Sequence, residues 1–374
     1  MKIRAAVLEQ SGLPAPYADT RPLVVQSVDL APPGPGEVLV RIAAAGICHS
    51  DLSVVEGVRP RPLPMVIGHE AAGVVEAVGE YVTDLQPGDH VVSVFVAACG
   101  HCNPCASGRP ALCEPGALAG GAGTLLGGAR RLSRDGQPIN HHSGISAFAE
   151  YATVSRYSLV KVDRDLALDE AALFGCAVLT GVGSAVNAAR VAPGSQVAVI
   201  GLGGVGLAAV LGALAAGAAR VVAIDVNADK LELARALGAT DTFDAKAQDV
   251  AEAVRDATSG GVDAALETAG ALAALELGYA ITRRGGELVT AGLPPPATRL
   301  AIPAVSLVAD EKSVRGSYMG SSVPSRDVPR FIELYRRGRL PVDRLVTHRL
   351  ALDEINAGMD RLREGRAVRQ IVTL

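Results

Sequence analysis

One glycine-rich turn constrains the fold of this chain more than any other feature. The segment Gly201-Leu202-Gly203-Gly204-Val205-Gly206 follows the apolar run QVAVI and opens a stretch with helical periodicity. The next apolar run, RVVAID, ends at Asp225. Strand, G-x-G-x-x-G turn, helix, strand and carboxylate in this order predict a βαβ unit that binds a dinucleotide. The glycines let the backbone approach a pyrophosphate, and the helix N-terminus supplies N–H groups and a partial positive charge.

Apolar runs and helical patterns alternate through the second half of the chain. Strands are expected at 196–200, 220–225, 241–243, 262–268, 286–293 and 313–318. Crossovers between most of these strands predict a parallel, doubly wound sheet. The proline-rich segment 294–300 is expected to replace the last crossover helix with a loop.

The residue that ends the second strand of this sheet bears on the choice of dinucleotide. A carboxylate there, Asp225, accepts hydrogen bonds from an adenosine ribose and repels a 2′-phosphate. Lys230 is close enough in sequence to reach the ribose as well. We therefore expect NAD rather than NADP, and the alternative is a glycine turn that an aspartate merely caps.

The first half of the chain has a different pattern of hydropathy. Residues 36–96 contain alternating or continuous apolar runs separated by Gly, Pro and Asp, a pattern that predicts a β-rich, antiparallel region. Residues 106–147 are rich in glycine and indicate a long loop. The final segment, RQIVTL, is expected to add a strand to this first domain. The resulting domains are 1–177, 178–320 and a return to the first domain over 321–374.

Four of the six cysteines are closely spaced as C-x2-C-x2-C-x7-C. Thiolates at such short separations are typical of one closed, tetrahedral zinc site that supports the fold. Four unrelated thiols are the alternative. The cysteines of this cluster are Cys99, Cys102, Cys105 and Cys113.

The other two cysteines are Cys48 and Cys176. His49-Ser50-Asp51 follows Cys48 directly, and Gly68-His69-Glu70 comes later. Read in isolation, a lone cysteine or histidine is more often a packed core residue than a ligand. The separations between these residues in the sequence are too long for a metal site formed within one loop. Any site that unites them must therefore be assembled by the fold.

Taken together, these motifs resemble those of the medium-chain zinc-containing alcohol dehydrogenases. Gly68-His69-Glu70-x2-Gly73-x5-Gly79-x2-Val82 is similar to the family's zinc signature, and Gly46 to Asp51 resembles its first-ligand loop. The resemblance spans the whole chain, and the loop before Phe148 resembles the branch with liver-type alcohol dehydrogenases and glutathione-dependent formaldehyde dehydrogenases. It implies an α/β fold, with a GroES-like β-rich catalytic domain and a Rossmann coenzyme domain.

The resemblance also implies roles for individual residues. Cys48, His69 and Cys176 would hold a catalytic zinc, so that each chain would hold two zinc ions. Asp51 would orient His69, Ser50 would take the alcohol proton, and Glu70 would lie behind the metal. His49 and Arg369 would approach the coenzyme pyrophosphate. The pocket residues implied by the resemblance are Phe95, Phe148, Leu118, Leu293 and Met319.

The proton relay departs from the family's pattern at one position. Many relatives carry a histidine three residues after the relay serine, where this chain has Ser53. We expect the relay to end at the coenzyme ribose and water without a terminal base. The alternative is that His49 takes that role.

The leading hypothesis is an NAD-dependent zinc alcohol dehydrogenase for primary, aromatic, allylic or secondary alcohols. A thiol-adduct formaldehyde dehydrogenase would need a cationic pocket, which Arg130, Arg131 and Arg134 could supply if they were not simply solvated. From another class, a non-catalytic protein that binds zinc and nucleotide is the third reading. His90, His141, His142 and His348 are expected to be structural, because the sequence gives them no partner.

The net charge is −4, from 35 Lys and Arg against 39 Asp and Glu. Such a balance of charges does not indicate a positively charged surface for binding nucleic acid or an anionic membrane. The uncharged run from Val205 to Ala219 is too short to cross a bilayer and predicts a buried helix. We expect a cytoplasmic enzyme whose partner is a small alcohol or aldehyde. By resemblance it is a homodimer paired near 305–318, or alternatively a tetramer.

Overall fold

A computed structural model describes residues 1–374, and the chain divides into two compact units. Unit 1 contains Met1–Cys176, Val323–Pro329 and Val346–Leu374, and unit 2 contains Ala177–Ser322 and Arg330–Leu345. The chain therefore leaves unit 1, builds most of unit 2 and returns. Residues 330–345, which we had assigned to the catalytic domain, cluster with unit 2 instead.

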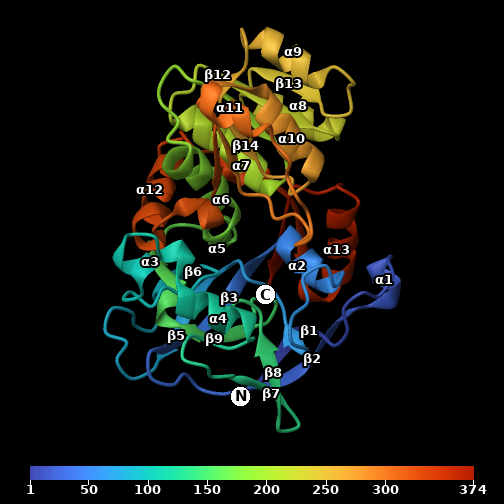
Figure 1. The fold of residues 1–374 in the computed structure, drawn as a ribbon. Coiled ribbons are helices and arrows are strands. Elements are labelled where there is room, and N and C mark those ends of the chain that lie inside the picture. The colour runs from blue at the N-terminus through green and yellow to red at the C-terminus, as the bar shows by residue number, and fades with distance from the viewer. The chain divides into compact units, whose positions relative to one another are not determined.

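Unit 1 combines a closed barrel with a seven-stranded sheet (Figure 1). In spatial order the barrel contains β1 (Lys2–Leu8), β2 (Leu23–Leu30), β7 (Leu132–Arg134), β8 (Gln137–His141) and β4 (Met65–Val66). The sheet contains β10 (Leu159–Val162), β6 (His90–Ser93), β5 (Ala71–Val78), β3 (Glu37–Ile47), β18 (Arg369–Thr373) and β17 (Val346–Ala351), with β9 (Tyr151–Ser155) also paired to β3.

The returning C-terminal segment pairs with unit 1 as expected. The pairings within residues 36–96, β3 with β5 and β5 with β6, are antiparallel as expected, whereas pairings that involve later strands are mixed. β18 runs antiparallel to β3 and parallel to β17, and β4 runs parallel to β8. Helix α13 (Ile355–Arg363) lies between β17 and β18 in sequence, and such a crossover permits parallel pairing. The expected long loop is also interrupted, by α4 (Glu114–Gly121) and by the β7–β8 hairpin.

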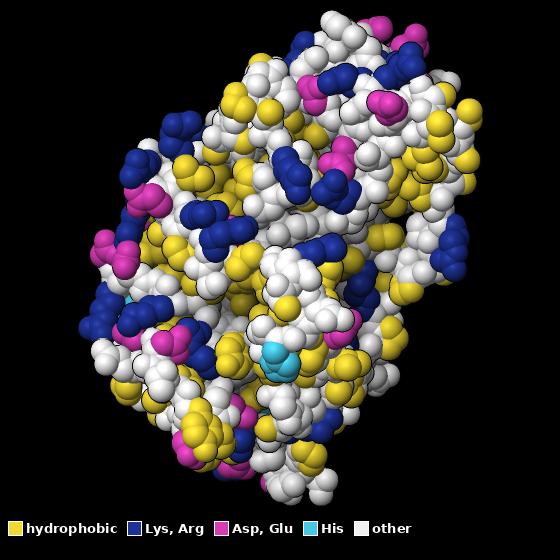
Figure 2. Space-filling model, turned by 60° about the vertical axis from the view of Figure 1, so that its left-hand side comes forward, with side chains coloured by type: hydrophobic (Ala, Val, Ile, Leu, Met, Phe, Trp, Pro, Cys, Tyr) yellow, Lys and Arg dark blue, Asp and Glu magenta, His cyan; other side chains and the backbone are white.

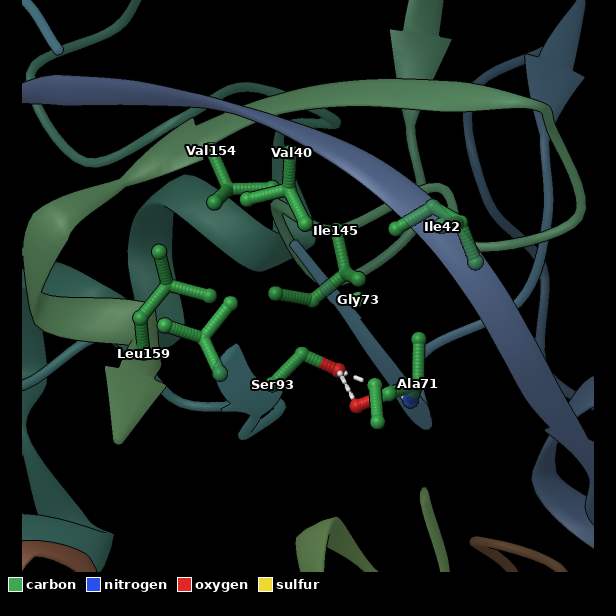
Figure 3. Close-up of a pocket in the computed structure, with 10 residues that line it drawn as sticks. Val40, Ile42, Ala71, Gly73, Ser93, Ile145, Val154 and Leu159 are labelled. Carbon is green, nitrogen blue, oxygen red and sulfur yellow. Dashed lines mark hydrogen bonds between the residues drawn. The ribbon is translucent and has the colours of Figure 1, made fainter. Parts of the chain in front are cut away.

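The core of unit 1 contains a small cavity lined by strands of the seven-stranded sheet and by Ile145 (Figure 3). Apolar side chains such as Val40, Ile145 and Leu159 line it. Ser93 is the polar exception, and its hydroxyl accepts from the Ala71 N–H at 2.8 Å and donates to the Ala71 carbonyl at 3.2 Å. Because that hydroxyl is satisfied by backbone, the cavity is a packing void and has no polar group aimed at a ligand.

Unit 2 is built on a six-stranded parallel sheet in the order β13-β12-β11-β14-β15-β16. The strands are β11 (Gln196–Ile200), β12 (Arg220–Asp225), β13 (Asp241–Asp244), β14 (Val262–Glu267), β15 (Thr282–Thr290) and β16 (Ser313–Gly316). All six coincide with strands expected from the sequence. The last crossover is not purely a loop, however, because α11 (Ala304–Ala309) precedes β16.

Helices cover the sheet of unit 2 and create the strand order of a dinucleotide fold. Helix α7 (Gly204–Ala215) links β11 to β12, and α8 (Ala228–Ala236) links β12 to β13. Side chains of α9 (Val250–Ala257) and α10 (Leu272–Ile281) share one apolar cluster with the central strands. From β11 the chain adds β12 and β13 on one side, then crosses back to place β14 on the other side of β11. The boundary between β11 and β14 is therefore the topological switch point, where such folds bind ligands.

No single helix is both long and apolar enough to cross a membrane, although one bent pair, Leu168–Gly175 with Ala177–Ala188, meets the criteria of length and composition together. Basic and acidic side chains are interspersed on the face drawn in Figure 2. Many charged side chains of the protein are paired, as in Arg41 with Glu76 and Arg349 with Asp169.

Candidate active site

Three potential metal ligands from distant parts of unit 1 meet in one buried place. Cys48 lies between the end of β3 and the start of helix α2 (His49–Val55), His69 lies between β4 and β5, and Cys176 follows a short helical turn. All three are buried, and their ligand atoms lie within 4.8 Å of one another. The Cys176 Sγ is 3.5 Å from His69 Nε2.

This constellation fits a zinc ion. Zinc bonds of about 2.3 Å to sulfur and about 2.0 Å to nitrogen, at tetrahedral angles, separate the two donor atoms by roughly 3.5 Å. The Cys176–His69 separation has that value. All six cysteines are free thiols, so none of the ligands is consumed by a disulfide. Three protein ligands leave the fourth position for water or substrate, which is typical of a catalytic rather than a structural site.

Asp51 ties two of the three ligands together. Its Oδ1 lies 2.8 Å from His69 Nδ1, and its Oδ2 accepts from the Cys48 N–H at 2.9 Å. The imidazole therefore presents Nε2 to the metal position. A carboxylate behind a ligating histidine fixes the ring and raises its basicity.

The electrostatics of the trio favour charged ligands. A hydrogen bond from the Cys176 thiol, aided by His69, holds the pKa of Cys48 well below its usual range. Burial opposes ionisation of Asp51, but the charge of His69 and its hydrogen bonds outweigh burial and lower the pKa of Asp51. Asp51 in turn raises the pKa of His69 against the effect of burial.

Glu70 lies beside the trio and is ion-paired with Arg369. Both side chains are buried, and burial raises the pKa of Glu70 to about 7, although Arg369 opposes that rise. A Cβ at Gly46 would lie 2.3 Å from the Glu70 carboxylate and 2.7 Å from the Arg369 guanidinium, so glycine is required there. The structure thus gives Arg369 a protein partner, and its contact with a pyrophosphate stays a prediction.

The relay residues lie on the first turns of α2. His49 is exposed and Ser50 is half-buried, next to Cys48. Ser53, which stands where many relatives carry histidine, donates its hydroxyl proton to the His49 carbonyl at 2.9 Å. Ser53 is therefore tied to the helix backbone and supplies no base to the relay.

The five pocket residues fall in both units. In unit 1, Phe95 meets the His69 ring edge-on with centroids 5.7 Å apart, Phe148 is fully buried in the core, and Leu118 is 74% exposed. In unit 2, Leu293 is exposed and Met319 is buried. Phe95 alone is placed against the metal ligands by a direct ring contact.

The four remaining cysteines converge in a separate lobe of unit 1. Their sulfur atoms lie within 4.8 Å of one another, and Cys102 Sγ is 3.9 Å from Cys113 Sγ. Two thiolates on a tetrahedral zinc lie roughly 3.8 Å apart for bonds of about 2.3 Å. Backbone N–H groups of Cys99 and Gly116 point at the Cys113 sulfur from 3.2 and 3.4 Å. Four protein ligands close such a site to substrate.

The glycine turn of unit 2 has the geometry of a phosphate cradle. Gly201 has φ +89°, and a Cβ at Gly206 would lie 1.8 Å from the Gly201 carbonyl oxygen, so both positions need glycine. A Cβ at Gly203 would meet nothing within 4 Å. Helix α7 begins there without a side-chain cap, which leaves its N-terminal N–H groups for an anion.

Asp225 and Thr268, which directly follows β14, hold this turn in place. Asp225 accepts from the Leu202 N–H at 2.6 Å and from the Asn227 N–H at 2.9 Å. Thr268 donates to the Gly201 carbonyl at 2.6 Å, and buried Glu267 accepts from the Gly270 N–H at 2.6 Å. Lys230 is half-buried in the first turn of α8. Sequence reasoning missed Glu267 and Thr268, although their place at the end of the strand predicted at 262–268 was a usable signal.

Arg130, Arg131 and Arg134 are engaged inside unit 1. Arg130 donates to Asn140 at 2.8 Å, Arg131 forms a two-pronged contact with Glu37, and Arg134 pairs with Glu9. These arginines are therefore neither simply solvated nor free to bind an anionic substrate.

Two of the histidines that we expected to be structural behave differently from each other. His141 accepts from the Arg131 N–H through Nε2 at 3.0 Å and faces Ser146 through Nδ1 at 3.3 Å. His142 lies 3.2 Å from Asp51, which places it beside the metal ligands. Sequence spacing could not have revealed this contact, because the fold alone brings residues 51 and 142 together.

His141 predicts an acid-sensitive stability. Burial, with help from Arg130 and Arg131, lowers its pKa to about 3, whereas the unfolded value is about 6.5. Below pH 6.5 His141 is protonated in the unfolded chain but stays neutral in the folded chain. The stability of the folded state therefore falls as pH falls from 6.5 towards 3. Relative to His141→Asn, we expect the unfolding free energy of the protein to fall by about 1 kcal/mol between pH 7 and 5.5. Urea unfolding of both proteins at the two pH values measures this, and parallel pH dependences would contradict it.

Comparisons with known proteins agree with this geometry. The family pattern of the alcohol dehydrogenase GroES-like domain matches residues 34–164, and that of the zinc-binding dehydrogenase matches residues 204–337.

Several solved structures resemble the chain along its whole length. An alcohol dehydrogenase zinc-binding domain protein from Burkholderia ambifaria is 36% identical, with a TM-score of 0.94 over 100% of this chain and 99% of that one. Benzyl alcohol dehydrogenase from Acinetobacter calcoaceticus is 35% identical, with a TM-score of 0.93 over 100% and 99%. A zinc-binding dehydrogenase from Sinorhizobium meliloti, bound to NADP, is 28% identical, with a TM-score of 0.82 over 100% of both chains. With these matches and the assembled Cys48–His69–Cys176 site, the chain belongs to the medium-chain zinc-containing alcohol dehydrogenases, a family of oxidoreductases.

Proposed function

We propose that this enzyme oxidises primary aromatic alcohols of the benzyl type reversibly to aldehydes with NAD, using one catalytic and one structural zinc per chain. The observation that carries the proposal is the buried Cys48–His69–Cys176 trio with Asp51 bound to the far side of His69. This donor set has an open position, whereas the four-cysteine cluster has none.

The residues of the chain divide the chemistry among them. When bound, zinc would supply Lewis-acid activation of the alcohol hydroxyl. Asp51 holds the Cys48 backbone and the His69 ring so that the ligands stay in place. Ser50 accepts the proton released from the hydroxyl and passes it towards the coenzyme ribose and water. When bound, the nicotinamide would supply the hydride acceptor for the reacting carbon.

The coenzyme is held by unit 2. The N-terminus of α7 and the open approach at Gly203 receive the pyrophosphate. Asp225 retains lone pairs beyond its two backbone contacts and accepts from the ribose hydroxyls. Lys230, half-buried in the first turn of α8, supplies positive charge near the ribose. Contacts of His49 and Arg369 with the phosphates rest on the family resemblance alone.

Two observations support an aromatic substrate over a thiol adduct. The Phe95 ring stands edge-on to His69, which gives an apolar wall beside the metal position. Arg130, Arg131 and Arg134 are all engaged with protein groups, so they offer no cationic pocket for the adduct's carboxylates. The likeness to a benzyl alcohol dehydrogenase points in the same direction.

NADH absorbance with zinc-loaded enzyme tests the proposal. The panel contains benzylic, allylic, primary aliphatic and secondary alcohols, and formaldehyde with glutathione, each with NAD and NADP. Highest kcat/KM for a benzylic alcohol with NAD supports the proposal. Turnover of the thiol adduct alone would overturn the proposal. No turnover of any substrate, with one zinc per chain, would favour a non-catalytic protein.

Asp225 provides a test of coenzyme choice, because the likeness to an NADP-bound relative makes the alternative concrete. Asp225→Gly removes both the ribose acceptor and the charge that repels a 2′-phosphate. Each lost charge-assisted hydrogen bond is worth about 1.5–3 kcal/mol. We therefore expect kcat/KM with NAD to fall by about 10- to 100-fold, while that with NADP rises or stays. A fall that is equal for both coenzymes would show a structural role only, and Asp229→Gly, in the next helix, is the control.

We also infer a homodimer formed through the edge of the unit 2 sheet. All four residues of β16 are exposed, and beside it in sequence Val305 and Val308 on α11 are 71% and 80% exposed. An unpaired edge strand with exposed apolar neighbours is suited to pairing with a second copy. Light scattering should give twice the chain mass of 38.2 kDa, and a monomer would contradict this inference.

A further inference from the structure

We propose that His142 is a positioning residue for the metal-binding histidine His69 and acts through the carboxylate of Asp51. The proposal rests on the proposed function, because it assumes that His69 holds a zinc ion. The proposal assigns a role to a histidine for which the sequence alone indicates no interacting residue.

One carboxylate oxygen lies between two imidazole rings. Asp51 Oδ1 is 2.8 Å from His69 Nδ1 and 3.2 Å from His142 Nδ1. The two rings meet edge-on, with centroids 5.3 Å apart and planes at 80°. All three side chains are at least 96% buried, so water does not compete for these positions.

The backbone fixes His142 against the strand that leads to His69. The His142 N–H lies 3.3 Å from the Val66 carbonyl and 3.2 Å from the Ser146 hydroxyl. Further along, the Ala147 N–H donates to the Gly68 carbonyl at 3.0 Å. The segment that carries His142 therefore runs beside the segment that carries the ligand, and the two rings keep their register.

The contact has a defined effect on the carboxylate. Asp51 Oδ2 is held by the Cys48 N–H, and Oδ1 by His69. His142 Nδ1 makes no well-aligned hydrogen bond, but from 3.2 Å it gives Oδ1 a second imidazole contact. We infer that this contact limits rotation of the carboxylate about its Cβ–Cγ bond. The orientation and basicity of a ligating histidine depend on the partner of its second nitrogen, so a looser Asp51 loosens His69.

A direct metal-binding role for His142 is the competing interpretation. The ligand atoms of Asp51, His69 and His142 do lie within 4.8 Å of one another. However, the 2.8 Å separation of Asp51 from His69 Nδ1 is a hydrogen-bond distance. A metal there would also need both nitrogens of His69 once Nε2 faces Cys176. The positioning role requires neither change.

The test compares three variants. His142→Phe keeps an aromatic ring against His69 but removes the nitrogen, and His142→Asn restores a short donor near the same point. His141→Asn is the matched control, because His141 is an equally buried neighbour that contacts Arg131 and Ser146 rather than Asp51. The readouts are the rate of zinc release to a colorimetric chelator, the visible spectrum after cobalt substitution of the catalytic site, and kcat and KM.

We expect His142→Phe to release the catalytic zinc about tenfold faster and to lower kcat about tenfold, the lower end of the range for such outer contacts. KM should change little, the cobalt spectrum should shift, and His142→Asn should recover most of both losses. His141→Asn should match the wild type in zinc release and spectrum.

Other results would overturn the proposal. Unchanged zinc release and cobalt spectrum in His142→Phe would leave His142 with packing alone, whatever happened to its thermal stability. A third zinc per chain that is lost in His142→Phe would favour direct coordination. Failure of the wild type to bind any zinc at Cys48, His69 and Cys176 would instead refute the proposed function, so the two failures are distinguishable.

Discussion

Replacing His69 with alanine is expected to remove the catalytic zinc and to lower kcat/KM for the best alcohol substrate by at least about 10³-fold. Lewis-acid activation is worth several kcal/mol, and each 1.36 kcal/mol corresponds to about tenfold in rate. The neighbouring Glu70 carboxylate is already paired with Arg369 and does not replace the imidazole, and Asp51 would be left buried without its main partner. Steady-state kinetics with elemental analysis of zinc measures both effects.

His101→Ala is the matched control for this prediction. His101 is also in unit 1, but it is exposed and its Nδ1 lies 2.9 Å from the Cys99 carbonyl, between two ligands of the other cluster. We expect this variant to keep two zinc ions and near-wild-type kcat/KM. Full activity of His69→Ala with only one zinc remaining would show that the reaction does not depend on the Cys48–His69–Cys176 site.

The sequence predicted the parallel sheet of unit 2 well because its signals are local. QVAVI and RVVAID became β11 and β12 without change of bounds, since each is an uninterrupted apolar run between breakers. The start of β15 at Thr282 was missed because TRRG is polar and looks like a loop. In this segment only Thr282 is both buried and paired with β14, whereas Arg283 to Gly285 are exposed, so no local pattern marks the start of the strand.

Unit 1 was harder to predict because its pairings are non-local. β18 lies between β3 and β17, so its parallel neighbour depends on a crossover through α13 that no pattern in RQIVTL reveals. The same reason limits the site. The metal-binding residues followed from motifs and a family resemblance, whereas the contact of His142 with Asp51 exists only because the segment 140–148 runs beside 64–69.

The four-cysteine lobe leads to the largest expected effect on stability. Cys113→Ser should remove one zinc per chain and lower the unfolding free energy by at least about 4 kcal/mol, as losses of structural metal do. Cys113 is fully buried, and its sulfur accepts from the Cys99 and Gly116 N–H groups, so its loss also weakens the start of α4. Urea unfolding and zinc analysis measure the two effects. Ser107→Ala, in the same loop, removes only a hydroxyl contact with the Asn103 carbonyl at 2.8 Å and is the control.

The loss should be confined to the lobe rather than spread through unit 1. β6 ends at Ser93 and β7 begins at Leu132, so both sheets of unit 1 close without any residue of the cysteine cluster. The three catalytic ligands, Asp51 and Phe95 all lie outside the segment 99–121, so we expect the Asp51–His69 contact to persist when that segment opens. In Cys113→Ser we therefore expect limited proteolysis to cut first between 99 and 121, while the second zinc stays bound. Loss of both zinc ions in one cooperative step would show instead that the lobe supports the catalytic site directly.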